Sequence, residues 1–122
     1  MRILAVEDQP EYLEMLQMVI SSVGHSILVA KNGIEAIQIL EREKVDVILS
    51  DVTMPTMGGI ELHRKVRSNP VDKETPFIFL TGLTDLNEVK QECTTSKDLL
   101  LQKPVSVDRL LKMFSGQLTK QL

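Results

Sequence analysis

The sequence predicts an α/β fold in which a doubly wound parallel β-sheet lies between two layers of helices. The first observation is that short runs of Val, Ile and Leu alternate along the chain with longer segments of helical periodicity. The second is that these runs are apolar at nearly every position, as in strands that are buried on both faces. The third is the length of 122 residues, which suits one domain with its own hydrophobic core.

The five apolar runs are the predicted strands. They are residues 2–6 (RILAV), 26–30 (SILVA), 45–50 (VDVILS), 77–81 (FIFLT) and 99–102 (LLLQ). Because a helical segment connects each strand to the next, right-handed crossovers place helices on both faces and produce a (βα)5 three-layer sandwich. We expect the strand order 2-1-3-4-5, in which the first and third strands are neighbours.

The first helix is predicted over residues 10–23. Pro10 suits its opening turn, because proline is tolerated where the backbone N–H has no helical partner. Its apolar residues share one stripe, which we expect to face the sheet: Leu13, Leu16, Ile20 and Val23. Asn32 and Gly33 form a turn that opens the second helix.

The third helix follows Gly58 and Gly59, and a fourth is expected between the last two strands. The fifth helix is predicted over residues 106–119. Ser106 can cap its first turn, because a hydroxyl oxygen accepts a hydrogen bond from the free N–H groups there. The apolar face of this helix is again a single stripe: Val107, Leu110, Leu111 and Phe114.

Composition excludes several classes of function. Fourteen Lys and Arg against 17 Asp and Glu leave a net charge of −3, so no basic surface indicates direct nucleic-acid binding or attraction to an anionic membrane. The single cysteine, Cys93, cannot form an internal disulfide. We see no signal peptide and no apolar segment long enough to span a membrane, and we therefore expect a cytoplasmic protein.

Polar residues stand at the carboxyl ends of the predicted strands. Glu7 and Asp8 follow the first strand, Asp51 follows the third, Thr81 ends the fourth, and Lys103 follows the fifth. Ligands of doubly wound sheets bind beyond this edge. Because the first and third strands are neighbours, three carboxylates are expected to crowd together there.

Crowded carboxylates repel one another unless a proton or a cation relieves the repulsion. Mg²⁺ prefers oxygen ligands and keeps several waters, so Glu7, Asp8 and Asp51, with the backbone carbonyl of Thr53, form a candidate magnesium site. No grouping of Cys and His residues suits zinc.

An open Mg²⁺ site beside a carboxylate, a hydroxyl and a lysine indicates phosphoryl chemistry, which depends on charge neutralisation and positioning. Asp51 is the candidate nucleophile and would form an aspartyl phosphate. Lys103 and Thr81 are the candidates to hold two of the phosphate oxygens, by an ammonium and a hydroxyl respectively.

Four motifs together resemble the receiver domains of two-component response regulators, in particular single-domain regulators of the chemotaxis type. The motifs are ED at 7 and 8, DVTMP from 51, LTG ending at 82 and QKP at 102–104, and the resemblance covers nearly all 122 residues. Thr81 lies 30 positions after Asp51 (81 − 51) and Lys103 lies 52 after it (103 − 51), which is similar to the spacing in that family. Each motif alone is weak, whereas all four in order are specific.

The resemblance implies a flavodoxin-like fold and Mg²⁺ bound near Glu7, Asp8, Asp51 and the Thr53 carbonyl. It implies a phosphohistidine donor on a sensor histidine kinase or phosphotransfer protein, and a signalling role in which the protein catalyses only its own phosphorylation and dephosphorylation. The output surface would comprise the fourth helix, fifth strand and fifth helix, and a downstream effector protein of unknown identity would read it. A cis peptide bond before Pro104 is also implied.

Some residues depart from the family pattern. Leu100 stands where receivers usually have Tyr or Phe, three positions before the lysine, so coupling between the site and the output surface is expected to differ. Lys97 suits a packed loop poorly, and we expect an altered end of the fourth helix. Among the remaining residues, we expect His63 to face solvent and Met57 to pack in its loop.

We expect residues 1–122 to form a single receiver domain without an output domain. One alternative is a receiver that works as a protein interaction module without phosphorylation, as Leu100 and Lys97 suggest. A haloacid-dehalogenase-type phosphatase is less favoured, because its motifs come in the reverse order and it usually has Asp where this chain has Thr53. A dinucleotide-binding fold is disfavoured because VEDQP replaces the glycine-rich turn after the first strand.

Overall fold

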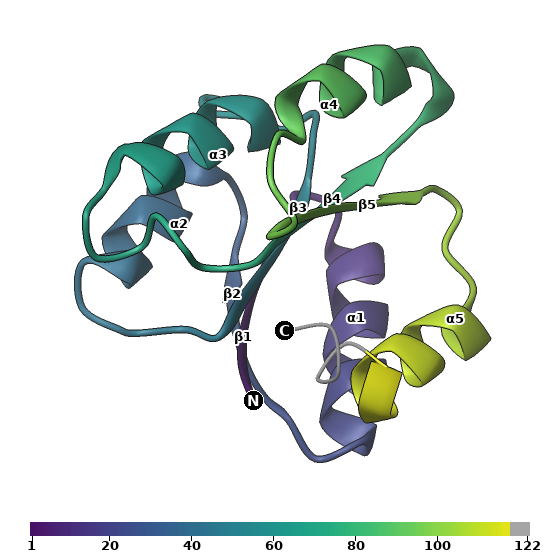
Figure 1. The fold of residues 1–122 in the computed structure, drawn as a ribbon. Helices are drawn as coiled ribbons and strands as arrows, with labels where there is room; N and C mark the ends of the chain where they lie inside the picture. Colours follow the sequence, from purple (N-terminus) through teal and green to yellow (C-terminus); the bar gives the residue numbers. More distant parts are fainter. Residues whose placement is uncertain (118–122) are drawn as a thin grey trace.

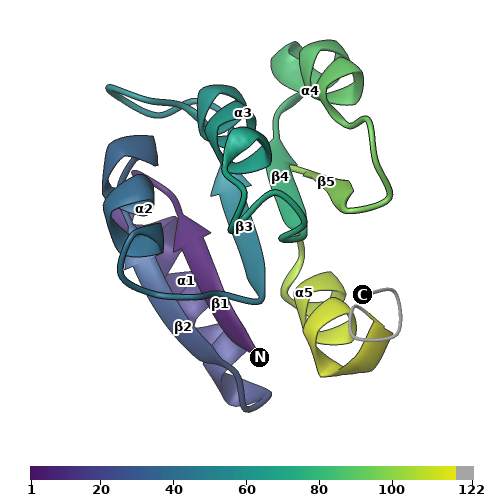
Figure 2. The ribbon, with the colours of Figure 1, turned by 60° about the vertical axis from the view of Figure 1, so that its left-hand side comes forward.

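The five predicted strands form one parallel sheet in the computed structural model, which describes residues 1–117. Their bounds are β1 (Arg2–Val6), β2 (Ser26–Ala30), β3 (Val47–Asp51), β4 (Phe77–Thr81) and β5 (Asp98–Gln102). The strand order is β2-β1-β3-β4-β5, as Figure 2 shows, and every pairing is parallel. The predicted fold class, including the strand order, is confirmed.

Helices connect the strands and cover both faces of the sheet. The α-helices are α1 (Pro10–Ser22), α2 (Gly33–Leu40), α3 (Gly59–Ser68), α4 (Leu86–Glu92) and α5 (Val107–Lys112). A 3-10 turn, η1 (Leu83–Asp85), precedes α4, and a π-type turn, η2 (Met113–Gln117), follows α5. In Figure 1, α1 and α5 lie on one face of the sheet, and α2, α3 and α4 lie on the other. Within the described part of the chain, no helix has the length and apolarity needed to cross a membrane.

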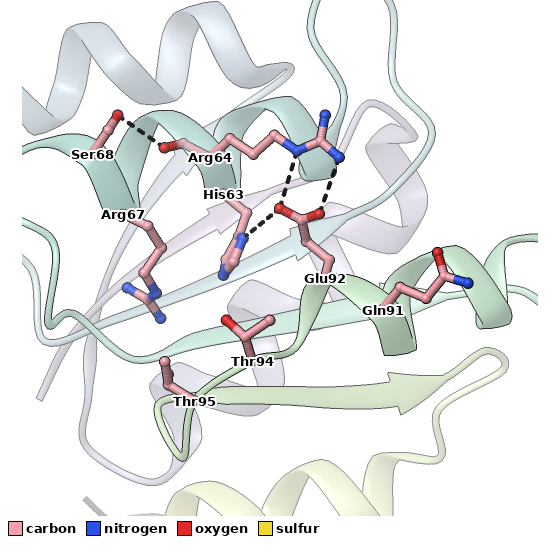
Figure 3. Close-up of a pocket in the computed structure, with 8 residues that line it drawn as sticks. All are labelled: His63, Arg64, Arg67, Ser68, Gln91, Glu92, Thr94 and Thr95. Carbon is pink, nitrogen blue, oxygen red and sulfur yellow. Dashed lines mark hydrogen bonds and ion pairs between the residues drawn. The ribbon is translucent and has the colours of Figure 1, made fainter.

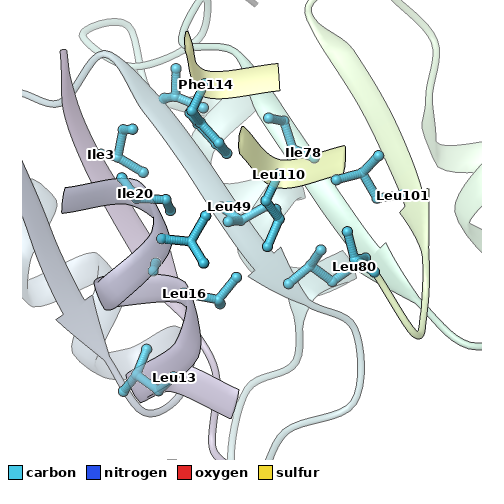
Figure 4. Packing of buried hydrophobic residues seen from close by; sticks show 14 residues of the cluster. Ile3, Leu13, Leu16, Ile20, Leu49, Ile78, Leu80, Leu101, Leu110 and Phe114 are labelled. Atoms are coloured by element: carbon cyan, nitrogen blue, oxygen red, sulfur yellow. The ribbon is translucent and has the colours of Figure 1, made fainter. Parts of the chain in front are cut away.

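Each face of the sheet has its own hydrophobic core. Residues of α1 and α5 pack on one face around Leu49 and Ile78, as Figure 4 shows. Residues of α2, α3 and α4 pack on the other face around Ile48 and Phe79. Because successive residues of a strand point to opposite faces, one short apolar strand supplies both cores. The ends of β1 and β3 therefore lie between two packed cores.

Helix ends show where the predicted bounds were inexact. The last helix was predicted to continue to residue 119, but α5 ends at Lys112 and is followed directly by the π-helix η2, in which the backbone of Gly116 is not helical. Positions 118 and 119 of that prediction lie outside the described residues. Helix α4 has only seven residues and ends at Glu92, so the residues directly before Lys97 are not helical.

The environment predicted for His63 was wrong. We expected this side chain to face solvent on α3, but the residue is 3% exposed and packs against the rings of Phe77 and Phe79. Met57, in contrast, is buried in its loop as expected. The peptide bond between Lys103 and Pro104 is cis, as the family resemblance implied.

Gly59 allows α3 to begin directly against the end of β3. A Cβ atom at this position would overlap the backbone carbonyl oxygen of Asp51 and lie 3.2 Å from the hydroxyl of Ser50. Because a backbone carbonyl cannot rotate away as a flexible side chain can, the close approach requires glycine. The start of α3 therefore helps to place the backbone of Asp51.

The substitution Gly59→Ala is expected to lower the free energy of unfolding by about 2–3 kcal/mol, because either α3 or the end of β3 must shift. Urea denaturation at equilibrium measures the change. Gly82→Ala is the matched control, since a Cβ at Gly82 would meet no atom within 4 Å. An equal loss of stability in both variants would contradict the explanation.

Candidate functional site

Three carboxylates meet at the carboxyl edge of the sheet, at the ends of β1 and β3. Oxygens of Glu7, Asp8 and Asp51 lie within 4.8 Å of one another, one from each side chain. Glu7 has no exposed surface and Asp51 is 8% exposed, whereas Asp8 is more open to solvent. The pairing of β1 with β3, in which Val6 lies opposite Ser50, brings these residues together from positions far apart in the sequence.

Lys103 joins this cluster from the loop after β5. Its Nζ lies 3.1 Å from Oε2 of Glu7 and 3.2 Å from Oδ1 of Asp51. Burial acts to lower the pKa of Lys103, but Asp51 and Glu7 outweigh burial and raise it. The ammonium therefore stays charged at neutral pH and neutralises part of the negative charge of the cluster.

The negative charge that Lys103 does not neutralise affects the pKa of Glu7. Burial is the largest cause that raises the pKa of this carboxyl group, and the charge of Asp51 raises it further. The hydrogen bonds that Lys103 and the backbone N–H of Gln9 donate to Glu7 oppose the rise without cancelling it. Ionised Glu7 thus makes the folded protein less stable than it would be with a neutral side chain at this position.

This charge imbalance predicts the effect of Glu7→Gln in metal-free buffer. A raised pKa means that the folded state binds more protons than the unfolded state above pH 4.5, so wild-type stability falls as the pH rises through this window. The variant lacks that penalty. We expect it to be more stable than the wild type by about 1 kcal/mol at pH 7, with the difference vanishing below the unfolded pKa.

Thermal unfolding between pH 4 and pH 8 measures this difference. Glu11→Gln is the matched control, because Glu11 is an exposed acid in the first turn of α1 and its loss changes the net charge equally. A stabilisation of the same size in both variants would assign the effect to net charge and would contradict the account of Glu7.

The two threonines of the predicted site have other partners in this structure. Thr81 ends β4 and is fully buried, and its hydroxyl donates a hydrogen bond to the carbonyl oxygen of Gly82 at 3.0 Å. Its backbone carbonyl accepts a hydrogen bond from the backbone N–H of Lys103 at 2.8 Å, which connects the end of β4 to the segment after β5. Thr53 is exposed, and its hydroxyl lies 3.3 Å from Oδ2 of Asp85. The roles of both threonines stay predictions.

The carboxylate cluster fits a magnesium ion. Oxygens that bind one Mg²⁺ at about 2.1 Å in an octahedron lie roughly 3–4 Å apart, so the observed separations need only small side-chain adjustments. The partial exposure of Asp8 leaves a side open for the waters that Mg²⁺ retains. Among the described residues, this is the only cluster of three acidic, Cys or His side chains with such spacing.

The prediction from sequence missed one residue of the site, Tyr12. This residue lies in the first turn of α1, and Nζ of Lys103 lies 4.6 Å from the centre of its ring. The sequence carried a usable signal, because the only tyrosine of the chain follows Asp8 by four positions, on a helix that begins at the edge of the sheet where the carboxylates were expected.

A second network of charged side chains lies between α3 and the segment before β5. One ring nitrogen of His63 lies 3.2 Å from Oε1 of Glu92, and Arg64 also binds Glu92, as Figure 3 shows. The other ring nitrogen of His63 lies 2.7 Å from Oδ1 of Asp98. Burial alone would raise the pKa of Asp98, but hydrogen bonds from His63 and Arg67 lower it. The network connects α3 to the end of α4 and the start of β5.

The chain is similar in sequence and fold to known receiver domains. The model of the response regulator receiver domain matches residues 3–115 of the chain. The chemotaxis response regulator CheY4 of Vibrio cholerae has a similar structure, with a TM-score of 0.82 and 30% sequence identity, and the match covers 99% of this chain and 98% of that one.

Two curated proteins are similar over most of this chain. Response regulator MprA of Mycobacterium leprae is 34% identical over 111 residues, which are 91% of this chain and 48% of that protein. Sensor histidine kinase RcsC of Escherichia coli K12 is 36% identical over 109 residues, which are 88% of this chain and 11% of that protein. The chain thus spans about half the length of the first protein and about a tenth of the second.

Proposed function

The chain belongs to the response regulator receiver domain family, and from this premise we propose that it is a phosphoryl-accepting switch with Asp51 as the acceptor. The observation that carries the proposal is the position of Lys103, whose ammonium lies between Asp51 and Glu7 in the carboxylate cluster. A carboxylate, a fixed ammonium and a cluster suited to Mg²⁺ are the groups that phosphoryl transfer to an aspartate requires.

The transfer is a displacement at phosphorus. A carboxylate oxygen of Asp51 attacks the phosphorus atom of a phosphohistidine, the new O–P bond forms, and the P–N bond to the donor imidazole breaks. The imidazole leaves with its electron pair and takes up a proton. Lys103 turns from the carboxylate oxygen of Asp51 to an oxygen of the phosphoryl group, and the Thr81 hydroxyl leaves Gly82 to donate to another oxygen.

Glu7, Asp8 and Asp51, with the backbone carbonyl of Thr53, would hold Mg²⁺ in this scheme. When bound, Mg²⁺ neutralises the charge that otherwise repels an incoming phosphate from the three carboxylates. Asp8 is the most open of the three side chains and so leaves the approach to solvent and donor free.

Phosphorylation is proposed to act through the surface of α4, β5 and α5. The movements of Thr81 and Lys103 reach this surface directly, because Thr81 ends β4 and Lys103 follows β5. Leu100 lies on β5, half-buried against the core of the α2, α3 and α4 face, and can fill space that Thr81 vacates. It offers less contact area than an aromatic ring, so the coupling is weaker than in receivers that have Tyr or Phe there.

The proposed partners are a sensor histidine kinase or a phosphotransfer protein as donor, and an effector protein that reads the α4, β5 and α5 surface. We place the protein in the cytoplasm and treat residues 1–122 as one receiver domain. The support for a phosphohistidine donor is family membership together with the acceptor cluster.

Intact-protein mass spectrometry tests the proposal. The purified protein is incubated with acetyl phosphate and Mg²⁺, and we expect the wild type to gain the mass of one phosphoryl group. Asp51→Asn is expected to gain none. Asp72→Asn is the matched control, because it neutralises a buried aspartate in the turn before β4 and leaves the site intact.

An interaction module that works without phosphorylation is the second candidate. The absence of an aromatic side chain at Leu100 favours it, because the usual link between the phosphate and the output surface is missing. A wild-type protein that gains no phosphoryl mass while remaining folded would support this candidate and contradict the first.

A further inference from the structure

The single tyrosine of the chain lies against the lysine of the carboxylate cluster. Nζ of Lys103 is 4.6 Å from the ring centre of Tyr12. The ring is partly buried and packs against the core between the sheet and the α1 and α5 helices. At this distance an ammonium is attracted by the negative face of an aromatic ring.

We propose that Tyr12 is a positioning residue for phosphoryl transfer, which keeps the Lys103 ammonium beside Asp51 through a cation–π contact. The inference rests on the proposed function, because it concerns how Lys103 reaches a phosphoryl group on Asp51. Tyr12 acts through Lys103 and is not itself a catalytic residue.

The contacts of the ammonium explain why a ring suits this place. An ammonium has three N–H donors. Nζ of Lys103 lies 3.1 Å from Oε2 of Glu7 and 3.2 Å from Oδ1 of Asp51. The ring of Tyr12 provides a further attractive surface. Since that attraction does not depend on one donor direction, it persists while Lys103 turns from Asp51 to a phosphate oxygen. A carboxylate in place of the Tyr12 ring would compete with the phosphate for the ammonium.

The ring, and not the hydroxyl group, is expected to carry this role. The hydroxyl of Tyr12 is buried near the backbone N–H of Val105, which favours the ionised form of the phenol. Burial raises the pKa of Tyr12, so the neutral phenol is the form at neutral pH. Tyr12→Phe therefore keeps the proposed contact, whereas Tyr12→Leu retains an apolar side chain but removes the ring.

Nuclear magnetic resonance of the metal-free, unphosphorylated protein tests the contact without any activity. The ring current should shift the terminal methylene protons of Lys103 upfield, and Lys103→Met identifies their signal by its loss. We expect the shift in the wild type and in Tyr12→Phe, and its disappearance in Tyr12→Leu. A wild-type signal at the position of an exposed lysine would overturn the proposal.

Phosphorylation by acetyl phosphate with Mg²⁺ tests the consequence. We expect Tyr12→Leu to react about 3- to 10-fold more slowly than the wild type, and Tyr12→Phe to react within about twofold of it. In a Lys103→Met background, Tyr12→Leu should cause no further loss. Urea denaturation of each variant establishes that the folded population is the same in the assay.

Two outcomes separate the inference from the proposed function. If the wild type is phosphorylated and Tyr12→Leu reacts as fast, the positioning role is wrong and the proposed function stands. The same conclusion follows if Tyr12→Leu slows the reaction by the same factor in the Lys103→Met background as in the wild-type background. If the folded wild type takes up no phosphoryl group, the proposed function fails and the positioning role fails with it.

Discussion

Removal of Mg²⁺ is expected to slow phosphorylation of Asp51 by at least about 100-fold. Without the ion, a phosphoryl donor must approach three carboxylates whose oxygens lie within 4.8 Å of one another, against one ammonium. Two unit charges 4 Å apart repel by about 4 kcal/mol at an effective dielectric constant near 20, which corresponds to roughly a thousandfold in rate. Because Lys103 offsets part of that repulsion, we expect the rate to fall by less than this full value but by at least about 100-fold.

The measurement is the rate of phosphoryl mass gain from acetyl phosphate in excess EDTA and in millimolar Mg²⁺. Restoring the rate by adding Mg²⁺ after EDTA controls for damage to the protein. K⁺ at equal ionic strength controls for general screening of charge. Equal rates with EDTA and with Mg²⁺ would show that the carboxylate cluster does not act through a divalent ion.

Replacement of Lys103 by Met is expected to change two properties in opposite directions. The Mg²⁺ affinity should rise, because the ammonium that competes for Glu7 and Asp51 is gone. The phosphorylation rate should fall by roughly 100-fold or more, since loss of one positioned donor to a developing charge typically costs 10²–10³ in rate. A purely structural role for Lys103 would weaken both properties together.

Calorimetric titration measures the Mg²⁺ affinity, and intact mass measures the phosphorylation rate at saturating Mg²⁺. Lys112→Met is the matched control, because Lys112 is an exposed lysine of α5 that pairs only with the exposed Asp108 among the contacts described for it. The control should leave both values near those of the wild type. Unchanged phosphorylation in Lys103→Met would refute the assignment of the ammonium to the phosphoryl group.

The positions of the acidic residues and of Lys103 could be predicted from the sequence because they follow from topology. Once the apolar runs are recognised as parallel strands, Glu7 and Asp51 must lie at the same edge, and the order of the strands makes them neighbours. Lys103 follows the last strand at that edge for the same reason. These predictions needed no knowledge of side-chain packing.

The environments of His63 and Tyr12 depend on packing between elements, which periodicity does not reveal. His63 is polar and lies on a helix, so a solvent-facing position was the simplest expectation. It is buried instead because Glu92 and Asp98 bring partners for both ring nitrogens from α4 and β5. Tyr12 was missed because its importance lies in a contact with Lys103, 91 positions later (103 − 12).

Chemical identification of the phosphorylated residue decides whether Asp51 is the phosphoryl acceptor. An acyl phosphate is reduced by borohydride, which converts the modified aspartate to homoserine, and peptide sequencing by mass spectrometry then locates it. After treatment of the wild type with acetyl phosphate and Mg²⁺, we expect homoserine at position 51. Homoserine at position 8, or a borohydride-resistant phosphate on a hydroxyl or imidazole side chain, would contradict it.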